Sequence, residues 1–126
     1  IQDGILNPFA EDFQEQYSVM RAMGCNFRVN HRTWWKEELP SEEEYATARA
    51  ALERINGAPD YIITHCAPTS VVKRVNRDYE PDKLTDFFEE VKKKGNFHYW
   101  LFGHYHENKI IDDRYVLLWE QIVQVI

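Results

Sequence analysis

Cysteine is scarce in this chain of 126 residues, which contains only Cys25 and Cys66. Two widely separated cysteines do not form the disulfide framework of a small secreted domain, so we expect free thiols and a reducing, cytoplasmic environment. Long apolar runs are also missing, because no stretch approaches the roughly 18–20 residues that a membrane-spanning helix needs. We therefore expect no membrane partner.

The chain also lacks an excess of basic residues. Fifteen Lys and Arg residues stand against 21 Asp and Glu residues, which gives a formal net charge of -6. Binding to a nucleic-acid backbone favours a basic face, so no partner of that kind is expected. A phosphate-bearing small molecule remains compatible with an acidic chain if metal ions supply positive charge locally. Hydrophobic residues make up 44% of the chain, which is enough to form a core.

Two helices are well signalled in the sequence. Ser41 followed by Glu44 predicts a capping box at the start of a helix that ends at Asn56-Gly57. A second helix is predicted from Asp82 to Gly95, where apolar residues recur at the spacing of one helix face. A weaker helical pattern covers residues 9–23. These segments predict an amphipathic helical layer.

Short runs with apolar or alternating character predict strands over residues 25–29, 61–64, 98–102, 108–111, 115–119 and 121–126. Asp112-Asp113 is a turn signal between two of them. The order of helix, strand, helix and strand, followed by several strands, indicates an α/β layer that passes into antiparallel sheet.

Histidines follow two of these predicted strands. His65 ends the apolar run that begins at Tyr61, and Gly103 leads into His104 and His106 after the next predicted strand. Ligands bind at the carboxyl ends of strands in α/β sheets. In extended backbone, side chains two residues apart point to the same side, so both imidazoles are expected to converge. Paired imidazoles suit divalent transition metals, and the three histidines therefore predict a metal site.

Other reactive side chains lack such a context. His98 opens its predicted strand rather than closing it, and His31 lies between Asn30 and Arg32, so both are interpreted as surface or structural residues. Cys66 neighbours His65, but a thiolate nucleophile needs a base and an oxyanion site, and the sequence indicates neither. Catalysis by Cys66 is therefore not expected.

Residues 61–68 resemble the strand-and-histidine motif of the calcineurin-like metallophosphoesterases, and residues 100–106 resemble the closing glycine-histidine-any-histidine motif of that family. The resemblance covers about residues 27–126, whereas residues 1–26 are poorly interpretable. Residues 34–38 and the helix after them are similar to bacterial members. The resemblance implies one partial domain over residues 1–126, which would be the carboxyl-terminal half of a four-layer α/β/β/α sandwich.

The resemblance also implies an activity and a cofactor. The expected reaction is metal-dependent hydrolysis of a phosphomonoester or phosphodiester substrate at two divalent or trivalent ions (Mn, Fe or Zn). His65 and His104 would be ligands of one ion, and His106 a ligand of the other. The family's aspartate-any-histidine, glycine-aspartate and glycine-asparagine-histidine motifs are absent from this sequence. The chain is therefore predicted to be inactive alone and to need an amino-terminal half from a longer parent chain or a separate partner.

Two other functions remain open. A degenerate, non-catalytic domain of the same fold would act as a binding or oligomerisation module, with exposed apolar surface and self-association. A mononuclear histidine site is the third alternative, with Asp60, Asp78 or Glu107 as a fourth ligand.

The segment from Pro68 to Pro81 is the one readable candidate for a substrate-selecting loop. Its cations are Lys73, Arg74 and Arg77. They would either contact an anionic leaving group or be solvated loop charges.

Overall fold

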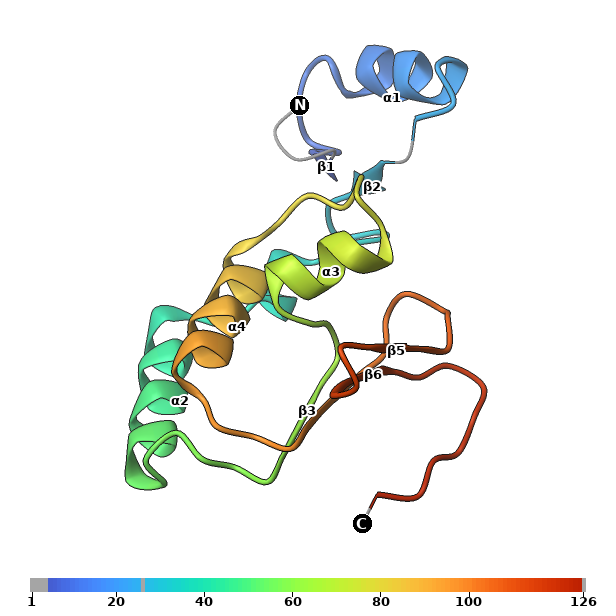
Figure 1. Ribbon diagram of the computed structural model, residues 1–126. Coiled ribbons are helices and arrows are strands. Elements are labelled where there is room, and N and C mark those ends of the chain that lie inside the picture. Colours follow the sequence, from blue (N-terminus) through green and yellow to red (C-terminus); the bar gives the residue numbers. More distant parts are fainter. Residues whose placement is uncertain (1–4, 26, 126) are drawn as a thin grey trace. The chain divides into compact units, whose positions relative to one another are not determined.

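A computed structural model of the chain describes residues 5–25 and 27–125 (Figure 1). Residue contacts divide the chain into two compact units, Ile1–Pro40 and Ser41–Ile126. The segment that resembles the phosphoesterase family therefore includes parts of both units. Among the described residues, no helix is both long enough and apolar enough to cross a membrane.

The first unit is a small β-α-β arrangement. Strand β1 (Ile5–Leu6) pairs in parallel with β2 (Arg28–Val29), and helix α1 (Phe13–Ala22) connects them. The 3₁₀ turn η1 (Lys36–Glu38) follows. A small core holds this unit together; its buried members are Leu6, Phe13 and Val29. The predicted helix over residues 9–23 is thus confirmed with a later start. Of the strand predicted over residues 25–29, only Arg28–Val29 is extended, and Asn26 lies outside the described residues.

The second unit contains the two strongly predicted helices. Helix α2 (Glu42–Arg54) begins with the expected capping box, because the Ser41 hydroxyl accepts the Glu44 N–H and the Glu44 carboxylate accepts the Ser41 N–H. These hydrogen bonds, from the Ser41 backbone first, lower the pKa of Glu44. Helix α4 (Lys83–Lys94) begins with a second capping box, between Asp82 and Thr85, which the sequence pattern had not indicated.

The four-stranded sheet of the second unit has the order β3-β4-β6-β5. Its strands are β3 (Tyr61–Thr64), β4 (Tyr99–Phe102), β5 (Lys109–Ile111) and β6 (Tyr115–Leu117). The antiparallel hairpin β5-β6 is as predicted, and its turn has positive φ at Asp112 and Asp113. In contrast to the predicted antiparallel arrangement, β6 pairs with β4 in parallel.

Burial explains this strand order. All three residues of β6 are buried, whereas β5 carries the half-buried Lys109 and the exposed Ile110. The more apolar strand therefore takes the interior position, and the strand with a lysine lies at the edge, as is usual for sheet edges. Together with the helices, the sheet confirms the α/β class of fold.

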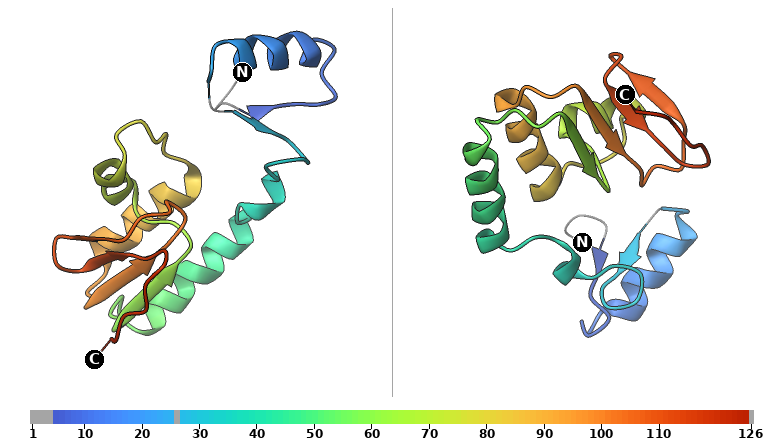
Figure 2. Two further views of the ribbon diagram at one scale, coloured as in Figure 1. Left: turned by 90° about the vertical axis from the view of Figure 1, so that its right-hand side faces the viewer. Right: turned by 90° about the horizontal axis from the view of Figure 1, so that it is seen from below.

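Side chains from the sheet and helices meet in one core. Its centre is Trp100, which is fully buried and packs edge-to-face on Phe88 and Phe97 at centroid distances of 5.5 and 5.4 Å. Helix α4 lies along this face of the sheet and contributes Phe87 and Val91 (Figure 2). Aromatic packing of this kind stabilises a core beyond its buried area.

The opposite face of the sheet carries a continuous apolar row. Strand register places Ile63, Leu101, Val116 and Ile110 side by side across all four strands. Leu101 and Val116 are buried, but Ile63 is 77% and Ile110 65% exposed. We call these four residues the outer row.

Two segments differ from the sequence expectation. Helix α3 (Thr69–Val75) occupies the first half of the segment predicted as a loop, and the buried Val71 and Val72 explain why it packs. Residues 121–125 form no strand, so the strand predicted over 121–126 is wrong for its described part (Figure 1). Ile122 and Val125 are exposed there, and no neighbouring strand pairs with this tail. Ile126 lies outside the described residues.

The second capping box gives a testable stability prediction. Asp82→Ala removes the acceptor for the Thr85 N–H and should lower the free energy of unfolding by about 1 kcal/mol. Asp82→Asn keeps a side-chain acceptor and should change the free energy of unfolding by only a few tenths of a kcal/mol. Urea denaturation with an unchanged m-value measures both. Equal losses in the two variants would contradict a capping role.

Candidate metal centre

The parallel register of β3 and β4 brings the two histidine segments together. Thr64 lies opposite Phe102, so the chain leaves both strands at the same edge of the sheet. One further hydrogen bond continues the ladder, in which the Gly103 N–H donates to the His65 carbonyl oxygen at 3.1 Å. The strand-end placement predicted from the sequence is therefore present for both His65 and His104.

Two partly buried hydrogen bonds fix the path of the chain beside His65. The Trp100 indole N–H donates to the Thr64 hydroxyl at 2.7 Å, and this hydroxyl donates to the Cys66 carbonyl at 2.5 Å. Ala67 and Pro68 follow as fully buried residues. His65 itself is exposed, so a rigid and buried segment presents an accessible imidazole.

His65 and His104 form a close pair. His65 Nε2 and His104 Nδ1 are 2.8 Å apart, and the two rings lie edge-to-face with centroids 4.7 Å apart. Without a metal, this contact is a hydrogen bond in which one ring donates and the other accepts, according to tautomer. Both imidazoles are exposed, so a solute can reach them.

The turn after β4 is made by histidines rather than by Gly103. His104 has φ 71° and His106 has φ 51°, whereas Gly103 is not among the residues with positive φ. The left-handed region costs a residue with a side chain roughly 1 kcal/mol or more, and such strain is concentrated at functional sites. The two strained residues are thus the two histidines of the motif.

His106 does not converge on the pair. The sequence argument assumed extended backbone, but both histidines have left-handed φ and lie outside any strand. The His106 ring instead stacks on Trp119, with centroids 5.6 Å apart and planes at 15°. Trp119 is itself held by its backbone N–H, which donates to the Asn108 side chain at 2.8 Å. The expectation that His104 and His106 point to one place is therefore wrong for this conformation.

The His65–His104 pair fits two ligands of a single ion. Two imidazole nitrogens bound at about 2.0–2.1 Å to one metal lie about 2.9–3.4 Å apart, depending on the coordination angle. The separation of 2.8 Å between the two ring nitrogens is close to the lower end of this range. Because the two nitrogens face each other in this contact, the rings would have to turn until both lone pairs point at the ion.

The part of the chain that the structure describes does not add a third ligand to the pair in a metal-binding group. Within residues 5–25 and 27–125, no group of three or more His, Cys, Asp or Glu side chains is arranged to hold a metal ion. Asp60 precedes β3 whereas His65 follows it, which separates them by more than about 13 Å at 3.3 Å per residue. Asp78 and Glu107 also lie outside any such group. The assignment of all three histidines as metal ligands stays a prediction.

The remaining histidines have other surroundings. His98 Nδ1 lies 3.7 Å from the Asp60 carboxylate at the amino end of β4. His31 is exposed, with φ 56°, in the first unit. Strand β4 therefore separates His98 from His104.

Tyr79 and Tyr105 were not identified from the sequence. Tyr105 is half-buried between the two histidines of the motif, and burial raises its pKa well above the usual value. Tyr79 comes from the connection between α3 and α4 and packs edge-to-face on Tyr105, with centroids 4.8 Å apart. Its ring lies 6.4 Å from that of His104. The sequence offered one signal for Tyr79, which is the only aromatic residue between Pro68 and Pro81.

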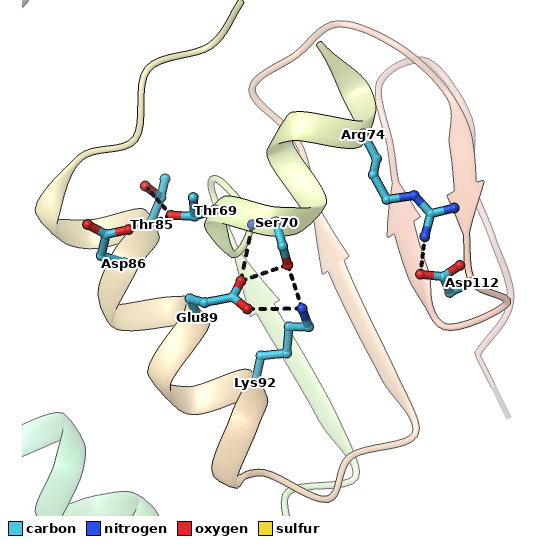
Figure 3. A network of polar contacts seen from close by, with 8 residues as sticks. All are labelled: Thr69, Ser70, Arg74, Thr85, Asp86, Glu89, Lys92 and Asp112. Atoms are coloured by element: carbon cyan, nitrogen blue, oxygen red, sulfur yellow. Dashed lines mark hydrogen bonds and ion pairs between the residues drawn. The ribbon is translucent and has the colours of Figure 1, made fainter. Parts of the chain in front are cut away.

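A polar network holds α3 against α4 (Figure 3). The Glu89 carboxylate accepts the Ser70 N–H and hydroxyl at 3.1 and 2.8 Å and pairs with Lys92 at 3.1 Å. Burial would raise the pKa of Glu89, but these hydrogen bonds lower it below its usual value. Because α3 begins four residues after His65, the network also steadies the segment beside the candidate centre.

Two of the three cations of the predicted loop, Lys73 and Arg74, contact the protein through their side chains. Arg74 pairs with Asp112 in the β5-β6 turn (Figure 3), and the Lys73 ammonium donates to the Arg77 carbonyl at 3.3 Å. These contacts favour structural roles over contact with a leaving group.

No family model matches the chain, and no curated protein or solved structure is significantly similar to it. The resemblance to metallophosphoesterases therefore rests on the two short histidine segments.

The structure predicts different reactivities for the two thiols. Cys66 is buried, and burial raises its pKa to about 11, whereas Cys25 is exposed. A disulfide reagent at pH 8 should therefore label one thiol in the folded chain and two in denaturant, and Cys25→Ser should abolish native labelling. Rapid native labelling of Cys66 would contradict its burial.

The raised pKa of Cys66 also predicts how stability depends on pH. Because the raised pKa favours the protonated thiol in the folded state, the free energy of unfolding should fall as pH rises from about 9 to about 11.

Proposed function

We propose that this chain is the carboxyl-terminal portion of a metal-dependent phosphoester hydrolase, cytoplasmic in location, which carries part of a dinuclear metal centre. The observation that carries the proposal is the 2.8 Å separation of His65 Nε2 and His104 Nδ1. These nitrogens come from segments 39 residues apart, and the strand register brings them to one edge. Two exposed imidazoles that converge at the carboxyl ends of neighbouring strands are suitable ligands for a transition metal.

The two histidines would hold one metal ion and set its orientation. When bound, the metals of a two-metal centre bind phosphate oxygens and lower the pKa of the attacking water. Backbone pairing at Gly103 and the partly buried Trp100–Thr64 hydrogen bond would keep the imidazoles in place during this chemistry. His106 would need to leave Trp119 to bind a second ion, and rotation of an exposed ring permits this.

The carboxylate ligands of the centre would come from outside the described residues. Two imidazoles leave most positions of a metal ion open, and dinuclear hydrolases need further anionic ligands. We propose that an amino-terminal half, in a longer chain or in a partner, supplies them. Its sheet would pack on the outer row and complete a four-layer α/β/β/α sandwich, which accounts for the exposed Ile63 and Ile110.

Metal binding by the histidine pair is the first test of this proposal. The chain should bind Zn²⁺ in competition with a chromophoric chelator, and His65→Ala or His104→Ala should weaken binding by at least about tenfold. His98→Ala is the matched control, because His98 lies at the other end of β4 and should leave Zn²⁺ affinity unchanged. With Mn²⁺ and an aryl phosphate, the chain alone should show no turnover.

One result would contradict the proposed metal centre, and another would contradict the need for a missing amino-terminal half. Absence of Zn²⁺ binding, or equal loss in all three variants, would exclude the metal centre. Robust aryl phosphate turnover that His104→Ala abolishes would keep the activity but exclude the need for a missing half.

A non-catalytic binding or oligomerisation module is the second candidate. The observation that favours it is the exposed apolar character of the outer face, where Tyr61 and Tyr99 stack with planes at 7° beside the outer row. Contiguous apolar surface of this kind marks interaction sites. A second copy of the chain would then cover this face without any metal.

This candidate predicts self-association that depends on the outer row. The chain should sediment as a dimer, and Ile63→Lys with Ile110→Lys should convert it to a monomer, because each lysine would be buried without a partner. Ile55→Lys is the control, since Ile55 is also exposed but lies at the end of α2. A monomeric wild-type chain that binds no metal would contradict both candidates.

A further inference from the structure

The connection between α3 and α4 places one aromatic ring beside the candidate centre. It is anchored at its start, where the Asp78 N–H donates to the Asn76 side chain at 2.9 Å and the Tyr79 N–H donates to the Asn76 carbonyl at 3.3 Å. The Tyr79 ring then lies 6.4 Å from the His104 ring, with planes at 60°. These hydrogen bonds to Asn76 hold the backbone at Tyr79, from which the ring extends.

Tyr105 provides a rigid support for the Tyr79 ring. The two rings are perpendicular at 4.8 Å, and Tyr105 packs in turn on Phe102, which is buried in the core, at 6.0 Å. Tyr105 also packs on His104 at 4.9 Å. The ring of Tyr79 is therefore connected to the strand that carries the candidate ligand, and its position is coupled to that of His104.

Tyr79 keeps surface available for a ligand. It is 37% exposed although it contacts both neighbours. Arg74, at the end of α3, is engaged elsewhere, because its guanidinium pairs with Asp112. The rings of Tyr79 and Tyr105 both pack near His104, and a planar apolar group could contact the exposed part of Tyr79.

We infer that Tyr79 is a specificity-determining residue that contacts the group esterified to the phosphate and favours a planar aromatic group. This inference rests on the proposed phosphoesterase function, since it takes the His65–His104 pair as the place where phosphate is held. A phosphate oxygen bound to a metal on His104 would lie at most about 4 Å from the imidazole nitrogen, the sum of two ordinary metal–ligand distances. The ring of Tyr79, centred 6.4 Å from the imidazole ring, is then close enough for the next group of the ester to meet it.

Binding of two phosphonates tests this inference without relying on turnover. The probes are phenylphosphonate and methylphosphonate, titrated by calorimetry into the Zn²⁺-loaded chain. The wild type should bind phenylphosphonate about two- to tenfold more tightly, as expected for one aromatic pair. Tyr79→Ala should abolish this preference and leave the methylphosphonate affinity within about twofold. Tyr79→Phe should retain the preference, because it keeps the ring.

Tyr99→Ala is the matched control for loss of a tyrosine ring. Tyr99 is 36% exposed, close to the value for Tyr79, but it lies on β4 at the end opposite His104. It should keep the phenyl preference. An unchanged preference in Tyr79→Ala, or an equal loss of affinity for both phosphonates, would overturn the assignment of Tyr79 alone. Failure of the wild type to bind Zn²⁺ or either phosphonate would overturn the proposed function, and this inference with it.

Discussion

The parallel pairing of β3 with β4 is the constraint on which the candidate centre depends. It aligns Thr64 with Phe102, and this register alone sets His65 beside His104 although the two are far apart in the chain. The buried Trp100 reinforces the pairing, because its indole N–H reaches across to the Thr64 hydroxyl at 2.7 Å. Because Trp100 is fully buried, slippage of this register would leave its indole N–H without this acceptor inside the core, which opposes slippage.

Local signals in the sequence predicted the elements of the second unit well. Ser41 with Glu44 marked the start of α2, and the apolar spacing around Phe87 marked α4, because capping and amphipathicity act within a few residues. The parallel pairing of β6 with β4 was not predictable in this way. It depends on which strand buries more apolar surface, and that comparison involves the whole sheet. Helix α3 was also missed, since its seven residues are too short for a clear periodicity.

Only the local features of the candidate centre could be predicted from the sequence. The strand ends at His65 and His104 follow from short apolar runs, and the sheet brings them together as expected. The direction of His106 depends on two backbone angles in the left-handed region, which residue type does not reveal for histidine. Tyr79 reaches His104 from a different connection, and that contact exists only once α3 and α4 are packed. Long-range packing therefore decides what surrounds the pair, whereas the local sequence decides the pair itself.

The imidazoles of His65 and His104 are exposed, whereas the residues that position them are buried or hydrogen-bonded, and this difference affects how the pair would bind a metal ion. The residues that position His65 and His104 are buried or hydrogen-bonded without help from an ion, as Trp100, Thr64 and Gly103 show. A metal would therefore meet ligands that are already close, and little ordering of the backbone would oppose its binding. The pair nevertheless leaves most coordination positions of an ion open, so affinity and net charge would depend on carboxylates brought by another segment. Under the proposed function, the close imidazole pair would be one part of a metal site, and its chemistry would depend on the ligands that the segment packed against the outer face of the sheet supplies.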